Sequence, residues 1–157
     1  MIARLLIAVC IAFGLASASH AQIRKPTAPE TKIVRDCFEQ KGDSAKGDQC
    51  VGLVSARCVR KPENQGGLSR ADCYRIEQVI WDVLLNETYK ALQGDLDEDE
   101  QKIKLRDMQR AWIASRDATC EFYYHKIQGS MSVPMTAACL LNETARRALL
   151  LAAFGGL

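Results

Sequence analysis

The sequence has no large excess of either charge and very little histidine. It contains 21 lysines and arginines against 19 aspartates and glutamates, and only two histidines. A chain with balanced charges lacks the positive surface that nucleic acid or an anionic membrane attracts. The catalytic patterns G-x-S-x-G, H-E-x-x-H and the P-loop do not occur either. We therefore predict no nucleic-acid partner, no enzymatic activity and no cofactor.

Long apolar runs are missing except at the N-terminus. Arg4 is followed by an apolar run over residues 5–15 and then by a stretch of small residues. This is the layout of a signal peptide, and about ten apolar residues are too few to cross roughly 30 Å of hydrocarbon. We predict that residues 1–21 are a signal peptide cleaved before Gln22, with cleavage before Ser19 as the alternative. A secreted or periplasmic protein without a membrane span is expected.

Six cysteines remain after the signal peptide, and their spacing does not suit a metal site. They are Cys37, Cys50, Cys58, Cys73, Cys120 and Cys139. An even number of cysteines in an exported chain predicts disulfides, here three. Structural zinc sites bring their ligands in close pairs such as C-x2-C, which this chain lacks. We therefore expect no bound metal.

The mature chain divides into a polar lead-in, a cysteine-rich segment and a helical region. Residues 22–36 contain two prolines and several charges, so a flexible lead-in is expected there. Residues 37–67 carry three cysteines and loop-forming stretches, with a short helix predicted over about 48–59. Residues 37–157 are predicted to form a single all-α domain whose N-terminal segment is tied down by cysteines.

Three main helices are predicted from residue 69 onward. The first runs to about residue 93, and Ser69 with Asp72 resembles a capping box at its start. Its apolar residues recur at helical spacing: Cys73, Ile76, Ile80, Val83 and Leu84. The second helix is expected over about 97–127 and the third over 132–154, after a short turn. The last two helices should form an antiparallel hairpin.

The hairpin predicts one disulfide by geometry. Cys120 lies about 10.5 Å from the end of the second helix and Cys139 about 9 Å into the third, at 1.5 Å per residue. The two cysteines therefore come level, as a disulfide requires. Six cysteines allow fifteen pairings, and only this pair has a geometric argument. The other two pairs are expected to be Cys58 with Cys73 and Cys37 with Cys50.

One face of the second helix mixes apolar and polar residues. Its members are Leu105, Gln109, Trp112, Arg116, Cys120, Tyr123 and Ile127. A buried guanidinium needs a carboxylate or several carbonyls as partners. The candidate partners on the first helix are Asp82, Asn86 and Tyr89. We interpret Gln109 and Arg116 as a structural network that fixes helix register, with a binding role as the alternative.

Four short patterns in the helical region belong together. They are Trp81-Asp82-x-x-Leu85-Asn86-x-x-Tyr89, Gln109-Arg110-x-Trp112-x-x-x-Arg116-Asp117-x-x-Cys120, Gly129-Ser130-Met131 and Cys139-x-x-x-x-Thr144-x-x-Arg147. Over residues from about 50 to 152 the chain resembles the LprI-type lysozyme-inhibitor domain family. The resemblance implies a small exported α-helical domain, and the family takes its name from the inhibition of lysozyme by a member. The signature positions carried over are Leu85, Asn86, Tyr89, Gln109, Trp112, Arg116, Asp117 and Cys120.

Two groups of residues on predicted loops are candidates for binding a lysozyme-type glycosidase, whose cleft carries an acid pair. They are Arg57, Arg60 and Lys61 beside Cys58, and His125, Lys126 and Ser130 at the helical turn. Removal of residues 1–21 takes away one arginine and no acid, which leaves a net charge of +1. Such a charge gives no steering toward the basic animal-type lysozymes. The alternative is a cell-envelope interaction or structural protein with another protein partner.

Overall fold

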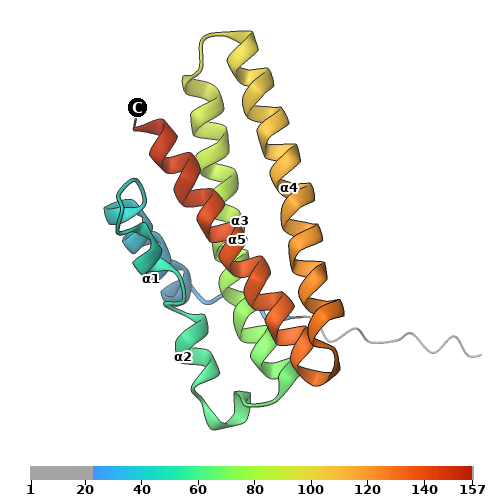
Figure 1. Ribbon diagram of the computed structural model, residues 1–157. Helices are drawn as coiled ribbons and strands as arrows, with labels where there is room; N and C mark the ends of the chain where they lie inside the picture. The colour runs from blue at the N-terminus through green and yellow to red at the C-terminus, as the bar shows by residue number, and fades with distance from the viewer. Residues whose placement is uncertain (1–22, 157) are drawn as a thin grey trace, which may run out of the picture.

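The computed structural model describes residues 23–156, and the regular elements in that part of the chain are all helical (Figure 1). The α-helices are α1 (Ala28–Lys41), α2 (Ser55–Val59), α3 (Gly67–Asp95), α4 (Asp99–Ile127) and α5 (Ser132–Gly155). Short 3-10 helices are η1 (Gly47–Cys50), η2 (Pro62–Asn64) and η3 (Gly129–Met131). The predicted all-α fold is confirmed. The predicted signal peptide lies outside the described residues.

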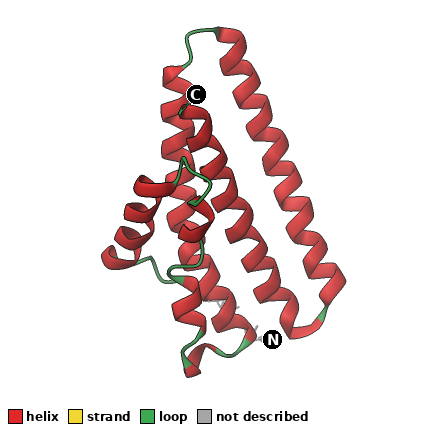
Figure 2. Cartoon of the chain, turned by 60° about the vertical axis from the view of Figure 1, so that its left-hand side comes forward, coloured by secondary structure: helices red, strands yellow, loops and turns green. Residues whose placement is uncertain are grey.

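The three long helices form the body of the molecule. Helix α5 packs along the length of α3 and also against α4, whereas α3 and α4 scarcely touch each other. Helices α1 and α2 lie on one side of the α3–α5 pair and α4 lies on the other (Figure 2). Among residues 23–156, no helix is long and apolar enough to span a membrane.

The core lies where α3, α5 and the N-terminal segment meet. Its buried side chains include Val34, Cys50, Ile80, Trp81, Leu84, Leu85, Leu141, Ala145, Ala148 and Leu151. Four residues of the apolar stripe predicted on α3 are buried, but Val83 is 45% exposed. Val83 lies one residue before Leu84, about 100° round the helix from the buried face. The predicted capping box at Ser69 does not form, because α3 begins at Gly67 with Gly66 as its N-cap.

The expectation of a flexible lead-in over residues 22–36 is wrong from Ala28 onward. The Thr27 hydroxyl accepts a hydrogen bond from the Glu30 N–H, and the Glu30 carboxylate accepts one from the Thr27 N–H. This capping box satisfies donors that are otherwise free at a helix start. The apolar face of α1 then packs on the core, with Val34 fully buried. The predicted domain boundary at residue 37 therefore falls inside a helix.

The short helix predicted over about 48–59 is divided into two pieces. Helix η1 ends at Cys50 and α2 begins at Ser55. Gly52 lies between them with a φ of 91°, a left-handed conformation that glycine adopts readily. The chain reverses there and brings the start of α2 onto α3, against which α2 packs.

Three disulfides join the elements, and the predicted pairing is confirmed. Cys37–Cys50 ties α1 to η1 with a Cα–Cα distance of 5.6 Å, and Cys58–Cys73 ties α2 to α3 at 5.5 Å. Cys120–Cys139 joins α4 to α5, also at 5.5 Å. The two cysteines of the hairpin thus come level as the helical rise requires. Each disulfide joins elements that are neighbours in the sequence.

Candidate protein-binding surface

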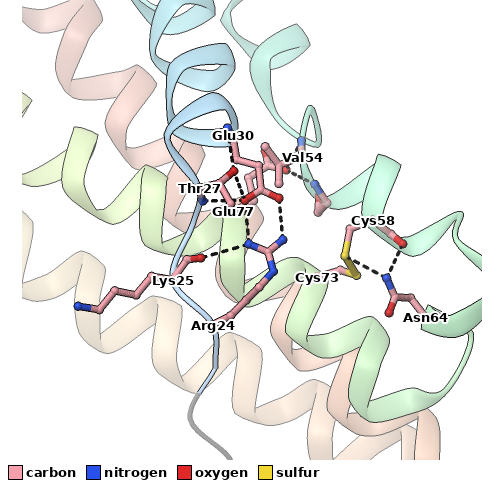
Figure 3. A network of polar contacts seen from close by, with 10 residues as sticks. Arg24, Lys25, Thr27, Glu30, Val54, Cys58, Asn64, Cys73 and Glu77 are labelled. Atoms are coloured by element: carbon pink, nitrogen blue, oxygen red, sulfur yellow. Dashed lines mark hydrogen bonds and ion pairs between the residues drawn. A yellow bond between two sulfur atoms is a disulfide. The ribbon is translucent and has the colours of Figure 1, made fainter.

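A buried carboxylate fixes the segment that carries the first candidate group. Glu77 of α3 is fully buried and accepts four hydrogen bonds; Figure 3 shows it beside Val54, one of the donor residues. The donors are the backbone N–H groups of Gly52 (2.6 Å), Val54 (3.0 Å) and Ser55 (2.6 Å), and the Trp81 indole N–H (3.1 Å). The first N–H groups of a helix have no partner within the helix. Glu77 supplies that partner for α2 and holds this segment on α3.

The end of α2 is held as firmly as its beginning. Cys58 is bonded to Cys73 of α3, and Asn64 donates a hydrogen bond from its side-chain amide to the Cys58 carbonyl at 2.9 Å (Figure 3). Gln65 donates a hydrogen bond from its side-chain amide to the Lys61 carbonyl at 3.1 Å. The backbone over residues 55–65 is therefore held at both ends.

An ion pair closes the N-terminal side of this region. The guanidinium of Arg24 donates two hydrogen bonds to the Glu30 carboxylate, at 2.8 and 2.6 Å (Figure 3). These bonds, together with hydrogen bonds from Thr27, lower the pKa of Glu30 to about 2. The same carboxylate raises the pKa of Arg24. Residues 24–27 are thereby tied to the first turn of α1.

A cleft of about 350 Å³ lies between α1 and α2 and contains part of the first candidate group. Its walls are formed by Arg24, Pro29, Glu30, Ile33, Leu53, Val54, Arg57, Cys58 and Lys61. Arg57 lies in α2 and Lys61 lies two residues beyond the end of that helix, and neither forms an ion pair within residues 23–156. Arg60 is exposed but lies outside the cleft. The cleft therefore combines apolar walls with two cations that are available to a partner.

The second candidate group lies at the same end of the helical bundle but not in the cleft. His125 and Lys126 are in the last turn of α4, and Ser130 is in η3; all three are exposed. His125 lies 3.6 Å from the Glu121 carboxylate. A Cβ added to Gly67 would be 2.6 Å from the Ser130 carbonyl, so this turn packs on the start of α3.

Three signature residues of α4, Gln109, Trp112 and Cys120, contact residues of α5. Arg116 does not reach the partners predicted on the first helix; it pairs with the adjacent Asp117 at 2.8 Å and lies 4.9 Å from the Trp112 ring centroid. The buried arginine is Arg147 of α5, which is 5% exposed. It donates a hydrogen bond to the Gln109 side-chain oxygen at 2.8 Å and lies 5.6 Å from Trp112. The partner differs from the prediction because α4 packs on α5.

Other signature positions divide between core and surface. Leu85 is buried and Tyr89 packs against the core, whereas Asn86 is exposed and donates a hydrogen bond to the Asp82 carbonyl at 2.7 Å. The sequence analysis missed Glu77, and it named Arg147 only within a family pattern, without predicting its burial or its contact with Gln109. Glu77 lies one turn before Trp81 on the apolar side of α3, and Arg147 lies among buried residues of α5. Each is a charged residue among apolar residues on one face of a helix, and this pattern could have indicated that both are buried.

These features define a small, disulfide-stabilised all-α domain with a rigid basic cleft. Residues 58–151 match the family model described as Lysozyme inhibitor LprI. Because the match covers more than half of the chain, the protein belongs to this family, and the resemblance found in the sequence is confirmed. No curated protein and no solved structure matches the chain.

Proposed function

We propose that this protein is exported and inhibits a lysozyme or a related wall-cleaving glycosidase by binding to it. The family match over residues 58–151 is the observation that carries the proposal. Three disulfides support a secreted or periplasmic location, because disulfides persist in oxidising compartments. In this proposal the protein occludes its target without covalent chemistry and catalyses no reaction itself.

The basic cleft suits a glycosidase active site. Such sites carry a pair of carboxyl groups, and Arg57 of α2 with Lys61 just beyond that helix offers two cations on the wall of one cleft. Both ends of that helix are fixed, by Glu77 and by the Cys58–Cys73 bond. A preordered segment loses less conformational entropy on binding than a flexible loop does. The proposed contact is insertion of these cations between the target's carboxylates.

The second candidate group extends the proposed contact. His125, Lys126 and Ser130 are exposed at the turn between α4 and α5, and this turn lies at the same end of the bundle as α2 (Figure 1). In the proposal they contact the rim of the target, where exposed charges contribute mainly to association rate. The signature residues Leu85, Gln109 and Trp112 hold the helices in place and make no contact with the target.

A titration of lysozyme activity with the disulfide-bonded mature protein tests the proposal. Inhibition should saturate at one protein per enzyme and weaken at high salt, because the cations act through Coulomb attraction. The double variant Arg57→Ala, Lys61→Ala should inhibit at least about tenfold less well, the equivalent of about 1.4 kcal/mol. Arg60→Ala is the matched control, since Arg60 is exposed in the same segment but lies outside the cleft. Equal losses in the two variants would contradict the proposed contact.

One observation favours the second candidate function, a cell-envelope interaction protein without lysozyme activity. Large apolar side chains are exposed around the end of α4: Phe122 (64%), Tyr124 (52%) and Met131 (44%). Aromatic residues and methionine are enriched at protein interfaces. If a stoichiometric excess of the protein leaves several lysozyme types fully active, this second function becomes the preferred one.

A further inference from the structure

A second hollow lies at the end of the bundle opposite the basic cleft, and its walls are largely apolar. It has a volume of about 920 Å³ and is formed by α3, α4, their connection and the end of α5. The residues that line it are Leu92, Leu96, Glu98, Glu100, Gln101, Lys104, Leu105, Met108 and Phe154. We call it the tip groove.

The tip groove exists because α3 and α4 are joined by a short connection and do not close on each other. Only residues 96–98 separate the two helices, which otherwise scarcely touch. Leu92 and Leu105 at the floor are 9% and 6% exposed, whereas Phe154 at the edge is 37% exposed. An apolar hollow open to water is a feature of binding grooves.

The α3–α4 connection beside the tip groove is rich in acidic residues, of which Glu98 and Glu100 line the groove itself, together with Lys104. Five carboxylates occur in the six residues from Asp95 to Glu100, against two lysines over residues 101–104. None of these five forms an ion pair with a residue in the described range 23–156. The helix dipole favours acids in the first turn of α4, which accounts for Asp99 and Glu100. It does not account for Asp95 and Asp97, which precede that helix.

The net charge of the whole chain is close to zero, although acidic residues gather at one end of the bundle and Arg57 and Lys61 line the cleft at the other. Helix α3 has 29 residues, so its two ends are about 40 Å apart at 1.5 Å per residue. That distance is several Debye lengths at physiological ionic strength. A partner at one end therefore responds to the local charge there and not to the charge of the whole chain. The tip attracts cations, whereas Arg57 and Lys61 attract anions at the other end.

We propose that the tip groove docks an amphipathic helix of a cationic protein partner. Leucine or phenylalanine side chains of that helix fill the space between Leu96, Met108 and Phe154, and its lysines or arginines pair with Glu98 and Glu100. This is the helix-in-groove mode of recognition, in which apolar anchors supply affinity and flanking charges supply orientation. The proposal goes beyond glycosidase inhibition and does not depend on it.

A labelled amphipathic helical peptide of leucine and lysine is the probe, and fluorescence anisotropy measures its binding to the disulfide-bonded mature protein. Binding should saturate at one peptide per protein and weaken when the ionic strength is raised to about 0.3 M. Glu98→Lys with Glu100→Lys should weaken binding at least about tenfold, and Phe154→Ala should weaken it several-fold. A peptide with glutamate in place of lysine should not bind.

Matched substitutions at the opposite end of the bundle are the controls. Glu63→Lys reverses an exposed charge there, and Leu68→Ala removes a side chain that is 70% exposed. Both should leave peptide binding unchanged, and melting temperatures verify that every variant is folded. Equal binding by the tip variants and the controls would overturn the proposal.

A second copy of this protein is the alternative occupant of the tip groove, and a measurement of self-association distinguishes it from a helical partner. Sedimentation at low salt measures whether the wild-type protein dimerises. The proposal is overturned if the wild-type protein forms a dimer but does not bind the peptide, and if the Glu98→Lys, Glu100→Lys variant is monomeric. The groove would then belong to a second copy. Lysozyme inhibition is tested with Arg57→Ala, Lys61→Ala, which lie outside the tip groove. Failure of the proposed function and failure of the tip-groove proposal are therefore separate results.

Discussion

Replacement of Glu77 by glutamine tests whether one buried carboxylate holds the N-terminal segment on α3. One carboxylate oxygen accepts hydrogen bonds from the Gly52 N–H and the Trp81 indole, and the other accepts them from the N–H groups of Val54 and Ser55. Glutamine has nearly the same shape, but an NH₂ group replaces one oxygen. Whichever way the amide is turned, two N–H donors face another donor.

The expected cost follows from these two lost acceptors. A hydrogen bond to a charged group contributes about 1.5–3 kcal/mol, and a buried donor left without an acceptor costs about 1–3 kcal/mol. Burying a neutral amide costs less than burying a carboxylate, which offsets part of the loss. We expect Glu77→Gln to lower the free energy of unfolding by about 3 kcal/mol. This is a large fraction of the roughly 5–15 kcal/mol of a typical domain.

Urea unfolding of the disulfide-bonded protein, followed by circular dichroism, measures this change. The matched control is Glu87→Gln on the same helix, because Glu87 is exposed and pairs with Arg35 at 2.7 Å. An exposed ion pair of this kind contributes less than about 1 kcal/mol. If Glu77→Gln costs no more than Glu87→Gln, the carboxylate does not anchor the segment and the reasoning is refuted.

Four further predictions concern stability. Serine in place of Cys120 and its partner should lower the unfolding free energy by about 3 kcal/mol, because the bond closes a loop with a sequence separation of 19; unchanged urea midpoints would contradict this. Arg147→Met should raise the unfolding free energy by about 1 kcal/mol in the same assay. Burial lowers the pKa of Arg147, and one of its Nη atoms is buried without a hydrogen-bond partner. A fall in the unfolding free energy of more than about 2 kcal/mol would show that the buried charge is needed. Arg116→Met removes a guanidinium whose side chain is 18% exposed and whose ion-pair partner, Asp117, is 57% exposed, and it should lower the unfolding free energy by about 1 kcal/mol in the same assay. Arg24 lowers the folded-state pKa of Glu30 to about 2. The contribution of this carboxylate to the unfolding free energy is therefore present above its ordinary pKa and is lost as pH falls toward 2. In the Glu30→Gln variant, the loss of stability between pH 5 and pH 2 should be smaller than in the wild type, by on the order of 1 kcal/mol after solvent screening.

The long helices and their hairpin could be predicted from the sequence because their determinants are local. The apolar residues of α3 recur at helical spacing, and helix ends lie close to the predicted residues. The fixed rise per residue brought Cys120 level with Cys139 across a short turn. The whole of α1 was missed, although Thr27 and Glu30 make a capping box in the sequence itself. The cap predicted at Ser69 and the single helix predicted over about 48–59 were also wrong.

The polar contacts of α4 needed the tertiary structure. Periodicity placed Gln109 and Arg116 on one face but did not show which helix that face meets. The predicted partners on α3 were wrong, because α4 packs on α5 and presents Gln109 to Arg147. Residues 38 positions apart meet here through helix packing, which no local pattern specifies.

The basic cleft and the tip groove also combine residues that the sequence identifies with surroundings that only the tertiary structure provides. Arg57, Arg60 and Lys61 were candidates because they lie beside Cys58 on a predicted loop, and the acidic run before α4 is evident in the sequence. Their surroundings depend on long-range folding. The cleft forms because Glu77 captures N–H groups 22 to 25 residues earlier in the chain, and the tip groove forms because the end of α5 arrives beside the α3–α4 connection. Sequence thus determined the helices and disulfides through local spacing, whereas the clefts required the three-dimensional meeting of distant segments.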